Sequence, residues 1–233
     1  MATNTKTYIG VVSTVGTAAI FYALLDSTWP HEPLRFGIYL LLALLASTLK
    51  LRLPGLTGTL SIGFVVVLLG IADLSLAETM LIACTGALVQ CYWRTLRRPT
   101  PIQVMFNLAA TAISVVLAYQ CARLVELRSH GSSVMIPMAV ATCIYFVAGS
   151  LLVSGVLSRI ESKSLRTIWE RCYLLSCPYY LLGGLIAGLV AASSKQVGWQ
   201  PALLILPVMS LAYLFYRIYL TRLSLGSPIA AER

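Results

Sequence analysis

Uncharged polar side chains inside one apolar run are the first candidates for chemistry. Gln103 and Asn107 stand four residues apart, so in a helix they share one face. Thr111 and Ser114 continue the same row, and Gln90 lies near the end of the preceding apolar run. Amides and hydroxyls of this kind line ligand cavities, but in membrane bundles they also hydrogen-bond to neighbouring helices. The sequence leaves both interpretations open.

A second group of candidates surrounds Pro178. Tyr179 and Tyr180 follow this proline directly, and Tyr173 precedes it by five residues. Because proline lacks an N–H, the sequence predicts a kink near Leu174 that exposes backbone carbonyls. The three tyrosines then offer rings and hydroxyls to a ligand. Tyrosines near a membrane face also act as interface anchors, and that alternative stays open.

The residue types that enzymes and metal sites need are sparse. The apolar runs hold no acidic residue apart from Asp73 and Glu78, which lie at a predicted turn, while His31 and His130 lie in predicted loops. The spacing shows no Cys/His metal pattern, no Ser/His/Asp set and no phosphate-binding loop. The sequence therefore predicts no catalytic residues and no metal ligands, names no cofactor, and makes a membrane-embedded enzyme a weak alternative.

Composition places these candidates in a membrane protein. The mean hydropathy is +0.85 and 11% of the residues are charged, whereas charged residues make up about a quarter of soluble domains. We predict an all-α polytopic transmembrane bundle, with one transmembrane domain over residues 1–223 and a cytoplasmic tail over 224–233. About eight apolar segments, two of them short, are expected at Tyr8–Leu25, Phe36–Leu49, Thr59–Ala72, Leu76–Tyr92, Ile102–Leu124, Val134–Leu157, Tyr173–Ser193 and Pro201–Leu220.

The basic residues predict the orientation. In the eight-segment arrangement, every Lys and Arg except Arg35, Arg123, Arg128 and Lys195 falls on one side. The positive-inside rule then places both termini in the cytoplasm of a multi-pass protein of the inner (plasma) membrane. The net charge of +9 is interpreted as a basic rim facing anionic lipid, not as a nucleic-acid surface. Charge does not decide whether residues 59–92 cross the membrane or form a re-entrant hairpin.

Glycines predict two local features. The stretch LKLRLPGLTGTLS, residues 49–61, indicates a compact turn that leads into a short helix, with Thr59 or Ser61 as its N-cap. Gly184 and Gly188 form a GxxxG pair, which is typical of close helix packing.

The run from Phe36 to Leu124 includes LKLRLPGLTGTLSIGFVVVLLGIADLSLAETMLIACTGALVQCYWRTLRRP. This run resembles the bacterial membrane-associated sensor (MASE-type) domains that precede HD-type phosphohydrolases or cyclic-dinucleotide signalling enzymes. The resemblance implies a sensory role and transfers no catalytic residues. The chain also bears a distant similarity to the substrate-binding subunits of energy-coupling-factor transporters, which have short, Gly-rich helices but usually six of them.

These observations predict a sensory domain that binds a small apolar or amphipathic ligand between its helices. The ligand is expected to contact the Gln103/Asn107 face and the Tyr179/Tyr180 region and to shift the last helix. The expected partners are the lipid bilayer, this ligand, and a cytoplasmic output domain or a second copy of the chain; nucleic acid is not expected. The alternatives are a vitamin-type transport subunit and a membrane-embedded enzyme.

Overall fold

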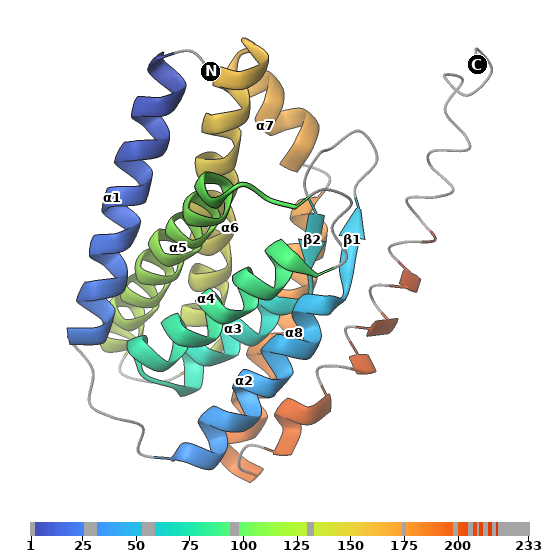
Figure 1. Ribbon diagram of the computed structural model, residues 1–233. Coiled ribbons are helices and arrows are strands. Elements are labelled where there is room, and N and C mark those ends of the chain that lie inside the picture. The colour runs from blue at the N-terminus through green and yellow to red at the C-terminus, as the bar shows by residue number, and fades with distance from the viewer. Residues whose placement is uncertain are drawn as a thin grey trace.

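Long apolar helices form the frame of the protein. Within the described residues, four helices are long and apolar enough to cross a membrane: α1 (Thr3–Leu25), α5 (Pro101–Arg128), α6 (Met135–Glu161) and α8 (Cys177–Val197). At about 1.5 Å per residue, α6 is about 40 Å long, which exceeds a hydrocarbon core of about 30 Å. In this computed structural model, α5 packs against both α1 and α6 (Figure 1). The predicted all-α fold class is confirmed.

The structure describes residues 3–25, 32–52, 59–93, 98–129, 133–173, 176–197 and 200–204, with the positions 207–208, 210–211, 214–215 and 218. Seven of the eight predicted apolar segments contain a described α-helix. The eighth, Pro201–Leu220, begins in a 3-10 helix, η2 (Gln200–Leu204), and most of its remainder lies outside the described residues. The predicted last helix is therefore largely untested.

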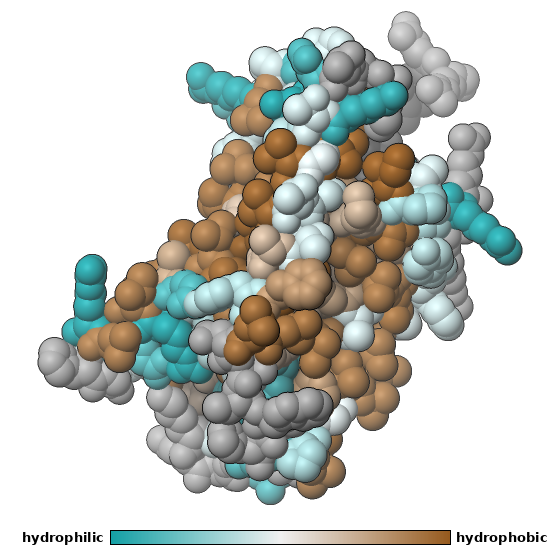
Figure 2. Space-filling view, turned by 60° about the vertical axis from the view of Figure 1, so that its left-hand side comes forward, coloured by the Kyte–Doolittle hydropathy of each residue, from teal (hydrophilic) through white to brown (hydrophobic). Residues whose placement is uncertain are grey.

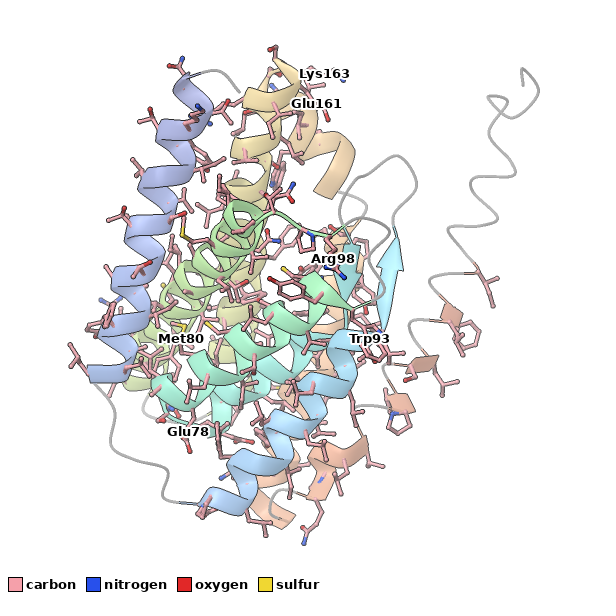
Figure 3. All side chains as sticks on the ribbon, viewed as in Figure 1. Glu78, Met80, Trp93, Arg98, Glu161 and Lys163 are labelled. Atoms are coloured by element: carbon pink, nitrogen blue, oxygen red, sulfur yellow. The ribbon has the colours of Figure 1, made fainter. Side chains whose placement is uncertain are left out.

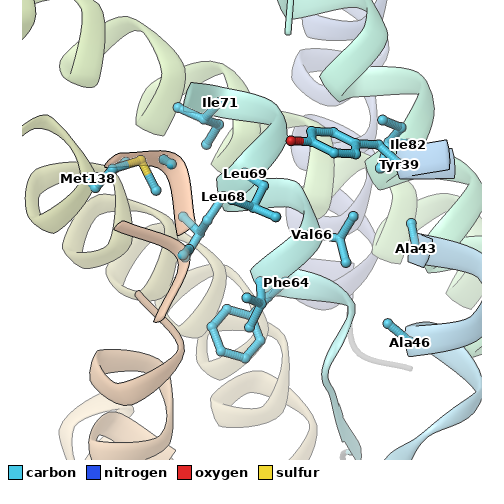
Figure 4. Packing of buried hydrophobic residues seen from close by; sticks show 14 of the residues in the cluster. Tyr39, Ala43, Ala46, Phe64, Val66, Leu68, Leu69, Ile71, Ile82 and Met138 are labelled. Atoms are coloured by element: carbon cyan, nitrogen blue, oxygen red, sulfur yellow. The ribbon is translucent and has the colours of Figure 1, made fainter. Parts of the chain in front are cut away.

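Three shorter helices lie within this frame: α2 (Pro33–Thr48), α3 (Gly63–Asp73) and α4 (Leu76–Tyr92). The 11 residues of α3 extend only about 16 Å, roughly half of a hydrocarbon core. Nine of them, from Gly63 to Ile71, are buried, as expected for a helix that is apolar on all sides. Figure 4 shows α3 side chains between Met138 of α6 and Tyr39, Ala43 and Ala46 of α2. Residues 63–92 therefore form a short helical hairpin whose first helix, α3, is enclosed by the bundle, while α4 keeps exposed residues such as Leu81 and Tyr92.

The turn between α3 and α4 is closed by its own side chains. Ser75 is the N-cap of α4, and its hydroxyl accepts a hydrogen bond from the Glu78 N–H. The Glu78 carboxylate in turn accepts from the backbone N–H of Ser75, at 2.9 Å. This capping box satisfies N–H groups that a buried helix start would otherwise leave without partners.

A two-stranded antiparallel sheet precedes α3. Strand β1 (Lys50–Arg52) pairs with β2 (Thr59–Ser61), and Leu51 lies opposite Leu60. The predicted N-cap is wrong, because Thr59 and Ser61 belong to β2 and the N-cap of α3 is Ile62, which makes no side-chain cap bond. The paired strands hold the chain extended up to Ser61, so the helix starts later than its apolar pattern indicates. The turn between the strands, residues 53–58, lies outside the described residues.

The predicted kink near Leu174 lies outside the described residues, but the structure shows where Pro178 sits. A helix α7 (Leu165–Tyr173) ends before the proline, and Pro178 is the second residue of α8. Proline fits the first turn of a helix because the N–H it lacks has no partner there. Helix α7 is not among the predicted apolar segments, because it is short and amphipathic. It rests on α6 through the buried Ile168 and through Trp169, whose Nε1 donates to the Ser150 Oγ at 2.9 Å.

The surface and the helix contacts agree with a membrane location. Figure 2 shows hydrophobic residues over much of the visible face, and Figure 3 places Glu78 at the opposite end of the molecule from Glu161 and Lys163.

The close packing predicted for the GxxxG pair, Gly184 and Gly188, is confirmed. A Cβ at Gly184 would overlap Thr142 of α6, and one at Gly188 would press on Met135 at 3.2 Å.

Candidate functional site

A cavity lies where the α3–α4 hairpin meets the long helices. Its volume is about 80 Å³. Six helices, α2, α3, α4, α5, α6 and α8, contribute to its wall. The described lining residues are Ala43, Ser47, Gly63, Phe64, Val67, Ile82, Ala83, Gly86, Ala87, Gln90, Thr111, Tyr145 and Tyr180.

The lining combines apolar and uncharged polar groups. Phe64, Val67 and Ile82 provide apolar surface, while Gln90 and Thr111 belong to the polar residues, together with Ser47, Tyr145 and Tyr180. Each described lining residue is uncharged. A lining of this kind suits a neutral molecule that has both an apolar part and hydrogen-bonding atoms, because a charged molecule would give up its hydration without an opposite charge in the wall.

The size of the cavity restricts what it holds in this conformation. Pockets for drug-sized ligands measure about 300–1,000 Å³, and an engineered apolar cavity that binds benzene measures about 150 Å³. At about 80 Å³, the cavity accommodates a few waters or a very small molecule. A larger ligand requires the surrounding helices to separate.

Small residues on α4 create the space. Ala83, Gly86, Ala87 and Gln90 recur at intervals of three, one and three residues, so they share one helix face. Gly86 faces α2 closely, since a Cβ built there would lie 2.9 Å from the Ser47 Oγ. This row of small residues ending in Gln90 is visible in the sequence and could have indicated the cavity, although only Gln90 was singled out as a candidate.

Aromatic rings connect the cavity to α8. The Phe64 ring centroid lies 4.3 Å from that of Tyr180 and 5.6 Å from that of Tyr179. Phe146 of α6 adds a further ring 5.0 Å from Tyr180. Gly183, one turn after Tyr179, leaves room for Phe64, whose ring a Cβ at this position would overlap. Phe64 therefore joins the cavity wall to α8 through direct ring contacts.

The structure brings only part of the predicted site together. Gln90 and Tyr180 line the cavity, as does Thr111 from the polar row on α5. Tyr179 is buried and packs against Phe64, but it is not among the described lining residues. Tyr173 ends α7, and its side chain lies outside what the structure describes.

Gln103 and Asn107 lie away from the cavity lining. Thr100 is the N-cap of α5, and the Gln103 Oε1 accepts a hydrogen bond from the Thr100 N–H at 2.9 Å. The Asn107 Nδ2 donates to the Cys91 Sγ of α4 at 3.4 Å. Both side chains therefore make exposed hydrogen bonds near the start of α5. Their predicted role in ligand binding stays a prediction.

A serine and a tyrosine from distant positions in the chain complete the wall, and no local sequence pattern links these positions. Ser47 comes from the end of α2 and Tyr145 from the middle of α6. Among the described residues, no group of three His, Cys, Asp or Glu side chains is placed to hold a metal ion.

Comparison with known proteins identifies the family. The MASE9 family model matches residues 28–182, which is about two thirds of the chain and includes every described residue that lines the cavity. No curated protein and no solved structure gives a significant match. The matched region contains the stretch from residue 49 to residue 99 that resembles membrane-associated sensor domains. The chain belongs to the MASE9 family of membrane-associated sensor domains.

Proposed function

We propose that the protein senses a small uncharged molecule that occupies the cavity between the α3–α4 hairpin and the long helices. The observation that carries this proposal is the uncharged, partly polar lining of a cavity to whose wall six helices contribute. Within that lining, Gln90, Thr111 and Tyr180 are the residues that recognise the polar atoms of the ligand. An amphipathic ligand of this kind reaches the site from the bilayer.

Binding changes the conformation only if the ligand has unequal affinity for two states of the bundle. The cavity supplies such a difference, since its volume of about 80 Å³ is too small for most organic ligands. A ligand that enters favours a conformation in which the hairpin has moved away from α5 and α8. The free protein favours the closed conformation described above.

The signal leaves the cavity through α8. Phe64 lines the cavity and contacts Tyr179 and Tyr180 of α8. The chain continues from α8 into η2 and then into the predicted last helix. With both termini in the cytoplasm, this last helix carries the change to a cytoplasmic output domain or partner protein.

Native mass spectrometry of the protein purified in mild detergent tests the binding step. The wild-type protein is expected to retain an uncharged small molecule. Ala87→Phe fills the cavity and Thr111→Val removes one hydroxyl from its wall without changing the shape of the side chain, so both variants are expected to lose the molecule.

Thr14→Val is the matched control. The Thr14 hydroxyl bonds to the Gly10 carbonyl oxygen within α1 and lies on an exposed face of that helix. This variant is expected to retain the molecule. Equal retention by all variants would place the bound molecule elsewhere, and the cavity would lose its proposed role.

The same experiment separates the alternatives. A vitamin-type transport subunit is expected to copurify with an ATPase partner, and a membrane-embedded enzyme is expected to convert the retained molecule. Retention without conversion, by a chain that copurifies with no ATPase, supports the sensor.

A further inference from the structure

The tip of the α3–α4 hairpin is the turn formed by residues 73–75. One side of this hairpin tip contacts α2. Asp73, the last residue of α3, has a side chain that is only 7% exposed. Its Oδ2 accepts a hydrogen bond from the Tyr39 hydroxyl at 2.7 Å and pairs with the Arg35 Nη2 at 3.1 Å. The Arg35 guanidinium also lies 5.9 Å from the centroid of the Tyr39 ring. Arg35 and Tyr39 are one helical turn apart on α2, so both reach the same carboxylate.

The other side of the tip is bound by α5. The Tyr119 hydroxyl donates to the Leu74 carbonyl oxygen at 3.3 Å. The Arg123 guanidinium lies 5.0 Å from the centroid of the Tyr119 ring, and its Nη2 donates to the Tyr119 hydroxyl at 3.3 Å. Glu126 pairs with Arg123 at 2.8 Å. An arginine and a tyrosine four residues apart are thus used twice, once on each side of the turn from α3 to α4.

The hairpin between these contacts is internally rigid. The Ser75/Glu78 capping box closes its turn, and the Thr79 hydroxyl bonds to the Ser75 carbonyl oxygen at 2.9 Å. Farther along the pair, a Cβ at Gly70 would lie 3.1 Å from the Thr79 Oγ1, which shows how closely α3 and α4 approach. Movement at the tip is therefore transmitted along both helices.

The part of the same hairpin that lies away from the tip forms much of the cavity wall. Gly63, Phe64 and Val67 come from α3, and Ile82, Ala83, Gly86, Ala87 and Gln90 come from α4. The contacts to α2 and α5 at the hairpin tip and the cavity wall thus lie at opposite ends of the same rigid hairpin.

We propose that the Arg35/Tyr39 and Tyr119/Arg123 pairs form a latch that holds the α3–α4 hairpin in the closed bundle and that its release opens the cavity. The latch deepens the proposed function by naming the element that moves. Its test needs no ligand, so failure of the latch would leave ligand binding in the cavity open.

The buried Asp73 carboxylate accounts for much of the stability of the closed latch. An Asp73→Asn substitution removes the negative charge and leaves Arg35 beside a neutral amide, and among the described residues the Arg35 Nε has no hydrogen-bond partner. Loss of the buried Asp73 charge disfavours the closed arrangement, because Arg35 then keeps only the exposed Glu32 carboxylate, 4.0 Å away, as an anionic partner among the described residues. The hairpin is then expected to open from its tip, where Asp73 is bonded to α2 and Leu74 is bonded to α5.

Hydrogen–deuterium exchange of the full chain in lipid nanodiscs tests the latch. Asp73→Asn is expected to accelerate amide exchange across Gly63–Tyr92 by about tenfold or more. Exchange in α1 and α6 should stay at the wild-type rate. Tyr119→Phe, which removes the bond to the Leu74 carbonyl from the opposite side, is expected to accelerate the same segment by a smaller factor.

Two matched controls accompany these variants. Glu170→Gln neutralises a carboxylate in the exposed Arg166–Glu170 pair of α7, and Tyr22→Phe removes a hydroxyl that bonds to Gln120. Neither is expected to change exchange in the hairpin. If Asp73→Asn does not fold, Tyr39→Phe serves instead, because it removes one hydrogen bond and keeps the ion pair. Unchanged exchange across Gly63–Tyr92, or equal acceleration in all helices, would overturn the latch.

Discussion

Replacing Gly16 by alanine tests how closely α1 packs against α5. A Cβ built at Gly16 would overlap the Cα and Cβ of Ala109 and lie 2.7 Å from its carbonyl oxygen. The neighbouring contact is apolar, with Ile9 and Val12 of α1 against Phe106 and Ala110 of α5. Because the obstacle is backbone, α1 itself must shift to accept the methyl group.

Gly10 provides the matched control within the same helix. It is exposed, and a Cβ there would meet nothing within 4 Å. Each Gly→Ala change gains about 1 kcal/mol of helix propensity. Overpacking at Gly16 costs about 1–3 kcal/mol, so the two variants should differ by this amount.

Thermal unfolding followed by far-ultraviolet circular dichroism, in one detergent for both variants, measures the difference. At about 2–4 °C per kcal/mol for a chain of this size, the Gly10→Ala protein should have a Tm about 2–12 °C above that of Gly16→Ala. Equal Tm values, or a higher Tm for Gly16→Ala, would show that α1 does not pack on α5 at Gly16, and the described contact would be refuted.

Two further predictions concern residues at the ends of the helices. Trp169→Phe removes the hydrogen bond from α7 to Ser150, at 2.9 Å. Because one such bond contributes about 1 kcal/mol, tryptic cleavage at Arg166 is expected to become about fivefold faster. An unchanged rate of cleavage would mean that the bond does not hold α7 in place. Gln103→Ala combined with Asn107→Ala removes the Gln103 bond to the Thr100 N–H and the Asn107 bond to Cys91, and it is expected to lower the free energy of unfolding by about 0.5–1.5 kcal/mol per bond in thermal unfolding. The double variant should still retain the bound molecule in native mass spectrometry, whereas loss of the molecule at unchanged Tm would favour the predicted ligand role of this pair.

Predictions from the sequence succeeded where neighbouring residues decide the structure. The segment Leu76–Tyr92 was predicted with the boundaries that α4 has, because Ser75 and Glu78 set its start and apolar residues continue to its end. Close packing at Gly184 followed from residue size alone. In contrast, the start of α3 was misplaced, since pairing between Lys50–Arg52 and Thr59–Ser61 is not visible in hydropathy.

The site was less predictable than the helices. Gln90 and Tyr180 were singled out and line the cavity, but Ser47 and Tyr145 join them from other helices. Asp73 was recognised only as part of a turn, and its partners Arg35 and Tyr39 are more than thirty residues earlier in the chain. No local pattern indicates which arginine a buried carboxylate will meet.

A helical membrane domain could be predicted from residue order, because hydropathy and segment length are properties of each stretch alone. The predominance of uncharged groups among the interior polar residues could be predicted in the same way. The enclosure of α3 by the bundle, the cavity formed by residues from six helices and the binding of the hairpin tip by two Arg–Tyr pairs became visible in the folded protein alone. These features depend on which helix faces meet, and that choice is made by packing between segments that are far apart in the chain.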